Sequence, residues 1–253
     1  MPFDLHNWVF VFIRTGGFLL MLPIFSAANI PVRLRVGLAA MVAFMISPGL
    51  PALALQDLNW PLLIGLIAKE VGVGLTLGFV TRMVFYAVDL AGALVATEMG
   101  LNLSISFNPA AGMQSQAPGM IFFYLAAILL LTLDLHHWLI AAFHRSYDVL
   151  PIGGASLRPG LLTAVVGYSQ GIWASALYIA APLIAVSFVI TLVFGVLSRA
   201  VPQMNVFSES FAFRTLAGLA VFGLTIQMMA QHISNYLRRL PEDLLRVAQL
   251  MGG

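Results

Sequence analysis

Two long charge-free apolar stretches, separated by one short polar turn, constrain this chain more than any other feature. The segment from Ile172 to Leu197 contains no Asp, Glu, Lys or Arg, and neither does the segment from Thr215 to His232. The turn between them contains Pro202 followed by two amides, Gln203 and Asn205. An amide left unpaired in hydrocarbon costs several kcal/mol. We therefore expect a hairpin of apolar helices whose turn meets water or protein.

The composition extends this expectation to the whole chain. Of the 253 residues, 60% are hydrophobic and only 9% are charged, whereas about 25% of the residues of a soluble domain are charged. A helix needs about 20 apolar residues to cross a bilayer. That length predicts an all-α, polytopic membrane protein with spans near 8–28, 36–55, 61–81, 118–140, 170–197 and 213–233. It also predicts a further apolar helix near 83–100, interrupted by Asp89 and Glu98.

Several classes of function are disfavoured by the residues present. The net charge of +2 gives no reason to expect a nucleic-acid partner. The chain has no cysteine, which excludes disulfides and thiolate metal sites. No nucleophile elbow, phosphate-binding loop or HExxH motif is present, and no serine has an evident base. We therefore expect no catalytic residues, no cofactor and no enzymatic activity.

Asp134, His136 and His137 are the one group that could suggest a metal site or a proton relay. They lie at the end of an apolar run and precede Trp138, and His and Trp are common at the membrane interface. No second cluster of ligands accompanies them. We therefore expect an interfacial position and no metal.

Charged residues, among them Arg14, Glu70 and Glu98, lie within or beside apolar stretches. An unpaired charge at the bilayer centre costs at least about 2.5 kcal/mol. Opposite charges could therefore pair inside the protein. Alternatively, these side chains could line a watery passage or bond to another subunit, and the sequence favours neither.

Small residues recur at four-residue spacing, which allows helix backbones to approach closely. They form three faces: Gly74 with Gly78, Gly167 with Gly171, and Gly92 with Ala96 and Gly100. Such faces could pack helices within the chain or against neighbouring subunits. Pro23, Pro48, Pro51 and Pro182 predict kinks, so that we expect bent helical hairpins.

The segment 103–116 is small, polar and free of charge, with isolated apolar side chains at Phe107 and Met113. It could be a simple connecting loop. Its composition also suits a segment that fills a pore, with soft apolar side chains that exclude ions and small residues that let it move. On this second reading Phe107, Asn108, Pro109 and Met113 form the plug.

The order of several motifs identifies a resemblance that covers nearly the whole chain. Arg14 precedes Pro23, Glu70 precedes a run of glycines, and Met99-Gly100-Leu101 leads into Ser106-Phe107-Asn108-Pro109. The most specific motif is Pro202-Gln203-Met204-Asn205-Val206-Phe207. In this order the motifs resemble the FliR family of flagellar protein-export components and its counterparts in type III secretion systems.

The resemblance implies a non-enzymatic subunit of the flagellar type III export gate in the bacterial inner membrane, at the flagellar basal body. Its implied partners are FliP-like and FliQ-like gate subunits, FlhB-like and FlhA-like export components, and unfolded export substrates. It implies a FliP-like part over 1–165 and a FliQ-like hairpin with a short basic tail over 166–253. The expected partner contact comprises Pro202, Gln203, Met204, Asn205 and Phe207, because Arg199 and Arg214 flank this turn and favour the cytoplasm.

Two positions depart from the family pattern, and other functions stay open. Asn108 replaces the usual aspartate, and Ala93 stands where a glutamate is common. The alternative functions are a virulence-type secretion subunit, a small-molecule transporter, which would show two repeated halves, and an intramembrane hydrolase. Met204 to Phe207 favours the flagellar system.

Overall fold

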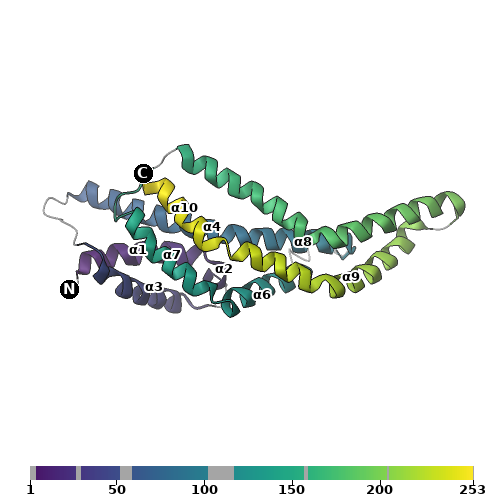
Figure 1. The fold of residues 1–253 in the computed structure, drawn as a ribbon, viewed down its shortest axis with the longest axis horizontal. Helices are drawn as coiled ribbons and strands as arrows, with labels where there is room; N and C mark the ends of the chain where they lie inside the picture. The colour runs from purple at the N-terminus through teal and green to yellow at the C-terminus, as the bar shows by residue number, and fades with distance from the viewer. Residues whose placement is uncertain are drawn as a thin grey trace. The chain divides into compact units, whose positions relative to one another are not determined.

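The computed structural model describes residues 4–26, 30–51, 59–101, 117–156, 159–203 and 205–252. Within these ranges the regular structure is helical, and none of these residues forms a β-strand. Figure 1 follows the helices in chain order, from purple at the N-terminus to yellow at the C-terminus. They are α1 (Leu5–Met21), α2 (Pro23–Ser26), α3 (Val32–Ile46), the 3-10 helix η1 (Ser47–Gly49), α4 (Trp60–Glu98), α6 (Ala117–Thr132), α7 (Leu135–Val149), α8 (Pro159–Ala200), α9 (Val206–Leu237) and α10 (Leu240–Gly252).

The chain folds into two compact units. Unit 1 comprises residues 1–84, 134–169 and 238–253, and unit 2 comprises residues 85–133 and 170–237. Both units are therefore built from segments that lie far apart in the sequence. The division at residue 165 that the resemblance implies concerns likeness to other subunits, and it stays a prediction.

In unit 1, α1 packs against α3 and α4. The Asp4 side chain accepts a hydrogen bond from the His6 N–H and so caps the first turn of α1. The helix ends before Pro23, which disfavours helical backbone at the preceding Leu22. A methyl group added to Gly74 would overlap the Arg14 carbonyl, and one added to Gly78 would lie 2.6 Å from the Phe18 carbonyl oxygen. The first small-residue face thus packs α4 against α1 within the chain.

The other half of unit 1 is a pair of contacting helices, α7 and α10. Phe143 on α7 stacks on Phe18 of α1 with ring centroids 4.7 Å apart. At the end of α10, the Met251 carbonyl accepts hydrogen bonds from the Ser156 N–H (2.9 Å) and from its hydroxyl (3.3 Å). The last turn of α10 is therefore tied to the segment that follows α7.

In unit 2, the end of α4 packs with α6, α8 and α9. Gly92 meets Gly119 of α6 so closely that an added methyl group would overlap its backbone. Phe122 of α6 contacts Phe222 of α9 at 5.6 Å between ring centroids. The α8–α9 hairpin is held by Phe194 and Phe213, whose centroids are 5.4 Å apart. By contrast, a methyl group added to Gly167 or Gly171 would lie within 4 Å of no other described part of the chain.

Among the described residues, four helical stretches are long and apolar enough to cross a membrane: Val32–Gly49, Trp60–Glu98, Thr163–Ala200 and Glu209–Gly252. A fifth is added if α6 and α7 form one broken span. The polytopic helical class is confirmed. The 39 residues of α4 and the 42 of α8 correspond to about 58 Å and 63 Å at 1.5 Å rise, roughly twice the hydrocarbon thickness.

Two sequence-based boundaries were wrong. The segments 61–81 and 83–100 form one helix, α4, because charged side chains such as Asp89 leave the backbone hydrogen bonds of a helix intact. The run 118–140 is divided at Asp134, whose φ of 54° is left-handed and ends α6 before α7 begins. The expected short basic tail forms an amphipathic helix, α10, with Glu242 and Asp243 in its first turn.

Candidate functional site

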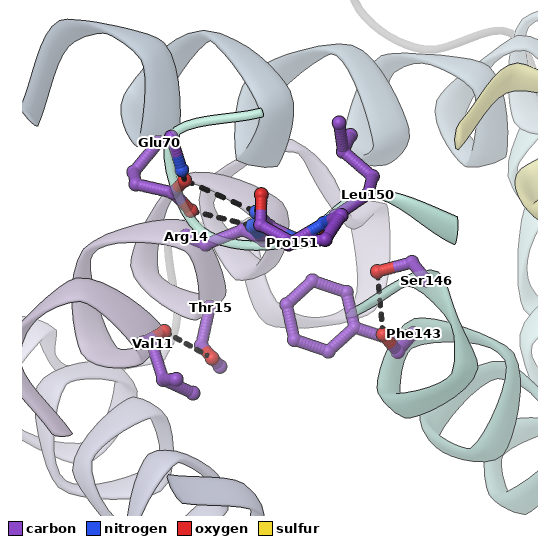
Figure 2. A network of polar contacts seen from close by, with 9 residues as sticks. Val11, Arg14, Thr15, Glu70, Phe143, Ser146, Leu150 and Pro151 are labelled. Carbon is purple, nitrogen blue, oxygen red and sulfur yellow. Dashed lines mark hydrogen bonds and ion pairs between the residues drawn. The ribbon is translucent and has the colours of Figure 1, made fainter. Parts of the chain in front are cut away.

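The most highly organised polar group in the chain surrounds Arg14, near the middle of α1 (Figure 2). Its guanidinium group donates from Nε to Glu70 Oε2 at 2.6 Å and from Nη2 to Glu70 Oε1 at 3.1 Å. Both side chains are fully buried. The two parallel bonds match the fork of the guanidinium group to the carboxylate, which is the strongest geometry for such a pair.

Backbone groups from the segment after α7 complete the cluster. Arg14 donates to the Leu150 carbonyl at 3.0 Å and to the Pro151 carbonyl at 3.5 Å. The Gly153 N–H donates to Glu70 Oε1 at 2.8 Å. Gly153 has a φ of +77°, which favours glycine at this position. The cluster therefore joins α1, α4 and the 150–153 segment.

An aromatic ring and a second cation border the pair. The guanidinium carbon of Arg14 lies 4.0 Å from the ring centroid of Tyr147, close enough for a cation–π interaction. Lys69 lies beside Glu70 in the sequence but donates to the Gly153 carbonyl at 3.0 Å. Adjacent residues on a helix point in different directions, so Glu70 turns inward while Lys69 is exposed at the same segment.

The energetics of this cluster indicate a structural role. Two isolated charges would each lose several kcal/mol of hydration on burial, and only close pairing with further hydrogen bonds offsets that loss. Here Arg14 and Glu70 satisfy one another and three backbone groups. Because every one of these bonds is made inside the chain, the pair holds α1, α4 and the 150–153 segment in one arrangement. For Arg14 and Glu70 the structure shows the internal-pairing alternative.

Glu98, the third charged residue singled out in the sequence, is not part of this cluster. It is the last residue of α4 and lies in unit 2, where it borders a small recess with Ser187 of α8 and Arg214 of α9. The sequence grouped Arg14, Glu70 and Glu98 as charges in apolar stretches, but the structure places the first two in unit 1 and Glu98 in unit 2.

The expected contact turn is well exposed where the structure describes it. Pro202, Gln203 and Asn205 are all exposed between α8 and α9. Met204 lies outside the described residues, and Phe207 lies in the first turn of α9. All four plug residues, Phe107, Asn108, Pro109 and Met113, also lie outside the described part of the chain.

The Asp134 group is compact but open to solvent. One ligand atom from each of Asp134, His136 and His137 lies within 4.8 Å of the others, and His137 Nδ1 is 3.5 Å from Asp134 Oδ1. The side chains of Asp134 and His137 are 73% and 70% exposed. Their closeness follows from the start of α7, which brings residues i and i+3 together. That no metal binds here stays a prediction.

The backbone partners of Arg14 and Glu70 are the part of the site that the sequence did not reveal. Carbonyl oxygens of Leu150 and Pro151 and the N–H of Gly153 have no residue-type signature, since every residue offers such groups. The only signal was the turn-forming composition of Pro151-Ile152-Gly153-Gly154. It predicts a turn but gives no partner.

Comparison with known proteins gives one consistent family. Residues 5–240 match the model of the family described as bacterial export proteins, family 1. The flagellar biosynthetic protein FliR of Escherichia coli strain K12 is 29% identical over 226 residues, which cover 88% of this chain and 86% of that protein. FliR of Pectobacterium carotovorum is 28% identical over 96% of this chain and 95% of its own length, and FliR of Bacillus subtilis is 29% identical over 79% and 78%. The chain belongs to the FliR family of bacterial export proteins.

Proposed function

We propose that this chain is a non-enzymatic subunit of the flagellar type III export gate in the bacterial inner membrane. In this role it forms, with FliP-like and FliQ-like subunits, the channel through which unfolded flagellar subunits leave the cytoplasm. FlhB-like and FlhA-like components of the export apparatus are further partners. The observation that supports it most is the family match over residues 5–240, together with relatives named as flagellar biosynthetic proteins.

The distribution of exposed apolar side chains supports a role within an assembly. On α3, Met41, Phe44 and Met45 are 60–71% exposed, and on α8, Trp173, Tyr178 and Val196 are 61–71% exposed. Large exposed apolar patches mark surfaces that meet lipid or protein. Since α4 and α8 are about twice as long as a bilayer is thick, part of each must be covered by protein or meet water.

The open small-residue face of α8 supports contact with neighbouring subunits. A methyl group at Gly167 or Gly171 would meet no atom of the described residues within 4 Å, whereas Gly74, Gly78 and Gly92 pack against other helices of the chain. We assign the Gly167–Gly171 face to another gate subunit, because small residues gain packing only when a second backbone approaches.

Two segments receive specific roles in this proposal. Residues 103–116, with Phe107, Asn108, Pro109 and Met113, close the resting channel. The turn with Pro202, Gln203, Met204, Asn205 and Phe207 faces the cytoplasm and contacts the FlhB-like partner. The exposure of Pro202, Gln203 and Asn205 supports the second role.

The function is tested in a flagellated bacterium from which the chromosomal copy of this gene is deleted. We expect a non-motile strain that makes hook and filament subunits but retains them in the cytoplasm, with export restored by a plasmid copy. Exported subunits are measured in the culture supernatant by immunoblot. The control is a virulence secretion substrate, where the organism has one.

The outcome separates the alternatives. Loss of flagellar export with normal virulence secretion supports the proposal, and the reverse result would assign the chain to a virulence-type system. Normal export of both substrates would leave the transporter alternative and contradict the gate function.

A further inference from the structure

The end of α4 meets the α8–α9 hairpin at a small recess in unit 2 that bears two opposite charges. Its walls include Glu98 and Met99 of the α4 end, Leu183 and Ser187 of α8, and Arg214 and Gly218 of α9. The recess has room for about one water molecule. All these residues belong to unit 2.

Arg214 is only partly satisfied at this position. Its Nη2 donates to the Thr191 hydroxyl of α8 at 2.8 Å. Its Nε is buried and has no hydrogen-bond partner among the described residues. A buried donor without an acceptor costs about 1–3 kcal/mol, and more when the group is charged. The guanidinium group therefore needs a further acceptor, and Arg214 is one of the residues that line the recess.

Glu98 supplies the complementary charge. It is half-buried at the last position of α4, and no direct ion pair between Glu98 and Arg214 is present among the described residues. One water molecule in the recess can accept from the guanidinium group and donate to the carboxylate. A bridging water contributes nearly as much enthalpy as a direct hydrogen bond.

Neighbouring contacts hold the two helices in the register that this bridge requires. The Thr215 hydroxyl donates to the Met99 carbonyl at 2.9 Å, which satisfies one free carbonyl at the end of α4. A methyl group added to Gly218 would lie 2.6 Å from Met99 Cγ, so α9 approaches α4 closely here.

From these contacts we infer that Glu98 and Arg214 form a water-bridged ion pair that positions the α8–α9 hairpin against the end of α4. Both are positioning residues. The inference concerns the folding of unit 2 and does not depend on what passes through the assembled gate. Its failure is therefore distinguishable from failure of the proposed function.

The test uses the full chain, expressed with its partner subunits, and measures the half-life of the membrane-bound protein by pulse-chase. The variants are Glu98→Gln, Arg214→Gln and both together. Each single variant leaves one charge unpaired among apolar helices, so we expect a half-life about three- to tenfold shorter. The double variant has no unpaired charge, so its half-life should be shortened by much less than the product of the two single fold-reductions.

Matched controls lie on the same hairpin. Arg199→Gln and Glu209→Gln remove the same charges from exposed positions and should change the half-life by less than about 1.5-fold. Arg214→Lys separates pairing from packing, since it keeps the charge, and it should stay within about twofold of the natural protein.

Three results would overturn the inference. The first is a half-life of both single variants equal to that of the controls. The second is a double variant whose half-life falls by the product of the two single fold-reductions. The third is an Arg214→Lys variant with a half-life as short as that of Arg214→Gln. If both single variants fall below detection, the exchange Glu98→Arg with Arg214→Glu decides. Recovery of a detectable protein supports the pair, and no recovery overturns it.

Discussion

At the scale of single residues, Arg14 has a role that lysine could not fill. Its planar guanidinium group makes two bonds to Glu70 while it also reaches the Leu150 carbonyl and the ring of Tyr147. A lysine ammonium group is a single point charge without this fork. The residue type, and not only the positive charge, therefore holds the three segments together.

We predict that Glu70→Gln destabilises the protein by about 3–5 kcal/mol, the usual cost of removing one partner from a buried ion pair. The amide keeps the size of the side chain but leaves the Arg14 charge uncompensated. The variant should show a much lower steady-state level in membranes, measured by quantitative immunoblot, and reduced swimming in soft agar.

The control for this prediction is Glu242→Gln, an exposed glutamate of α10 in the same unit. Its protein level and its swimming should match the natural protein. A Glu70→Gln variant that is as abundant as this control would show that the Arg14 charge needs no carboxylate.

Sequence reasoning reached only part of this site. A charge inside an apolar helix needs a partner, and that rule singled out Arg14 and Glu70. It could not choose between internal pairing and a watery passage, because the two residues are 56 positions apart and only the packing of α1 on α4 brings them together. The same rule also singled out Glu98, and there too it gave no partner.

At the scale of helices, the same small-residue spacing has two different outcomes. Gly74 and Gly78 pack against α1, whereas none of the residues that the structure describes would lie within 4 Å of a methyl group at Gly167 or Gly171. The spacing is identical, so the difference comes from the surrounding helices. A sequence pattern can therefore predict that a face allows close approach, but not which backbone approaches it.

We predict that Gly74→Ala destabilises the α1–α4 contact by about 1–3 kcal/mol, the usual cost of overpacking. Gly72→Ala on the same helix is the matched control, because its added methyl group would meet nothing within 4 Å. It should be neutral or stabilising by up to about 1 kcal/mol, since alanine favours helices.

The measurement for both glycine variants is the temperature at which the detergent-solubilised complex aggregates. Equal temperatures for Gly74→Ala and Gly72→Ala would contradict the close approach of α4 to α1.

A further prediction concerns the segment between α4 and α6. Deleting residues 106–113 from the assembled gate should raise ion leakage, because a passage wide enough for an extended polypeptide passes ions unless something fills it. Growth in the presence of small toxic solutes and a membrane-potential dye measure the leak. If the gate that lacks residues 106–113 assembles and does not leak ions, Phe107 and its neighbours are only a linker.

The helices themselves were predictable to the extent that hydropathy controls them. Apolar length predicted more spans than the four or five that the described residues contain. Pro23, expected to kink a span over 8–28, instead begins α2 after α1 has ended, and Pro202 lies in the turn between α8 and α9, as expected. The continuity of α4 was missed because hydropathy falls at charged residues while helical hydrogen bonding does not. The helix α10 was missed because it is amphipathic, and its apolar face is recognisable only at a period of 3.6 residues.

At the scale of the whole molecule, large exposed apolar side chains mark surfaces that meet lipid or protein. Leu224 is 83% exposed, Leu216 is 69% exposed and Met45 is 71% exposed. We predict that expression without FliP-like and FliQ-like subunits gives aggregated or degraded protein, and that co-expression raises the membrane-bound level at least several-fold.

The comparison is made by size-exclusion chromatography after extraction in mild detergent. Co-expression with an unrelated polytopic membrane protein is the control and should give no increase. A monodisperse, long-lived monomer would count against this prediction.

The contact between Ser156 and Met251 also has a consequence for how the protein is made. Unit 1 needs residues 1–84 and residues 238–253, and the hydrogen bonds to the Met251 carbonyl join its middle segment to its last helix. A ribosome produces the α8–α9 hairpin before it produces α10. The face of α7 that α10 covers must therefore stay open until the α8–α9 hairpin has been synthesised. In this order of synthesis the α8–α9 hairpin is complete before unit 1 closes.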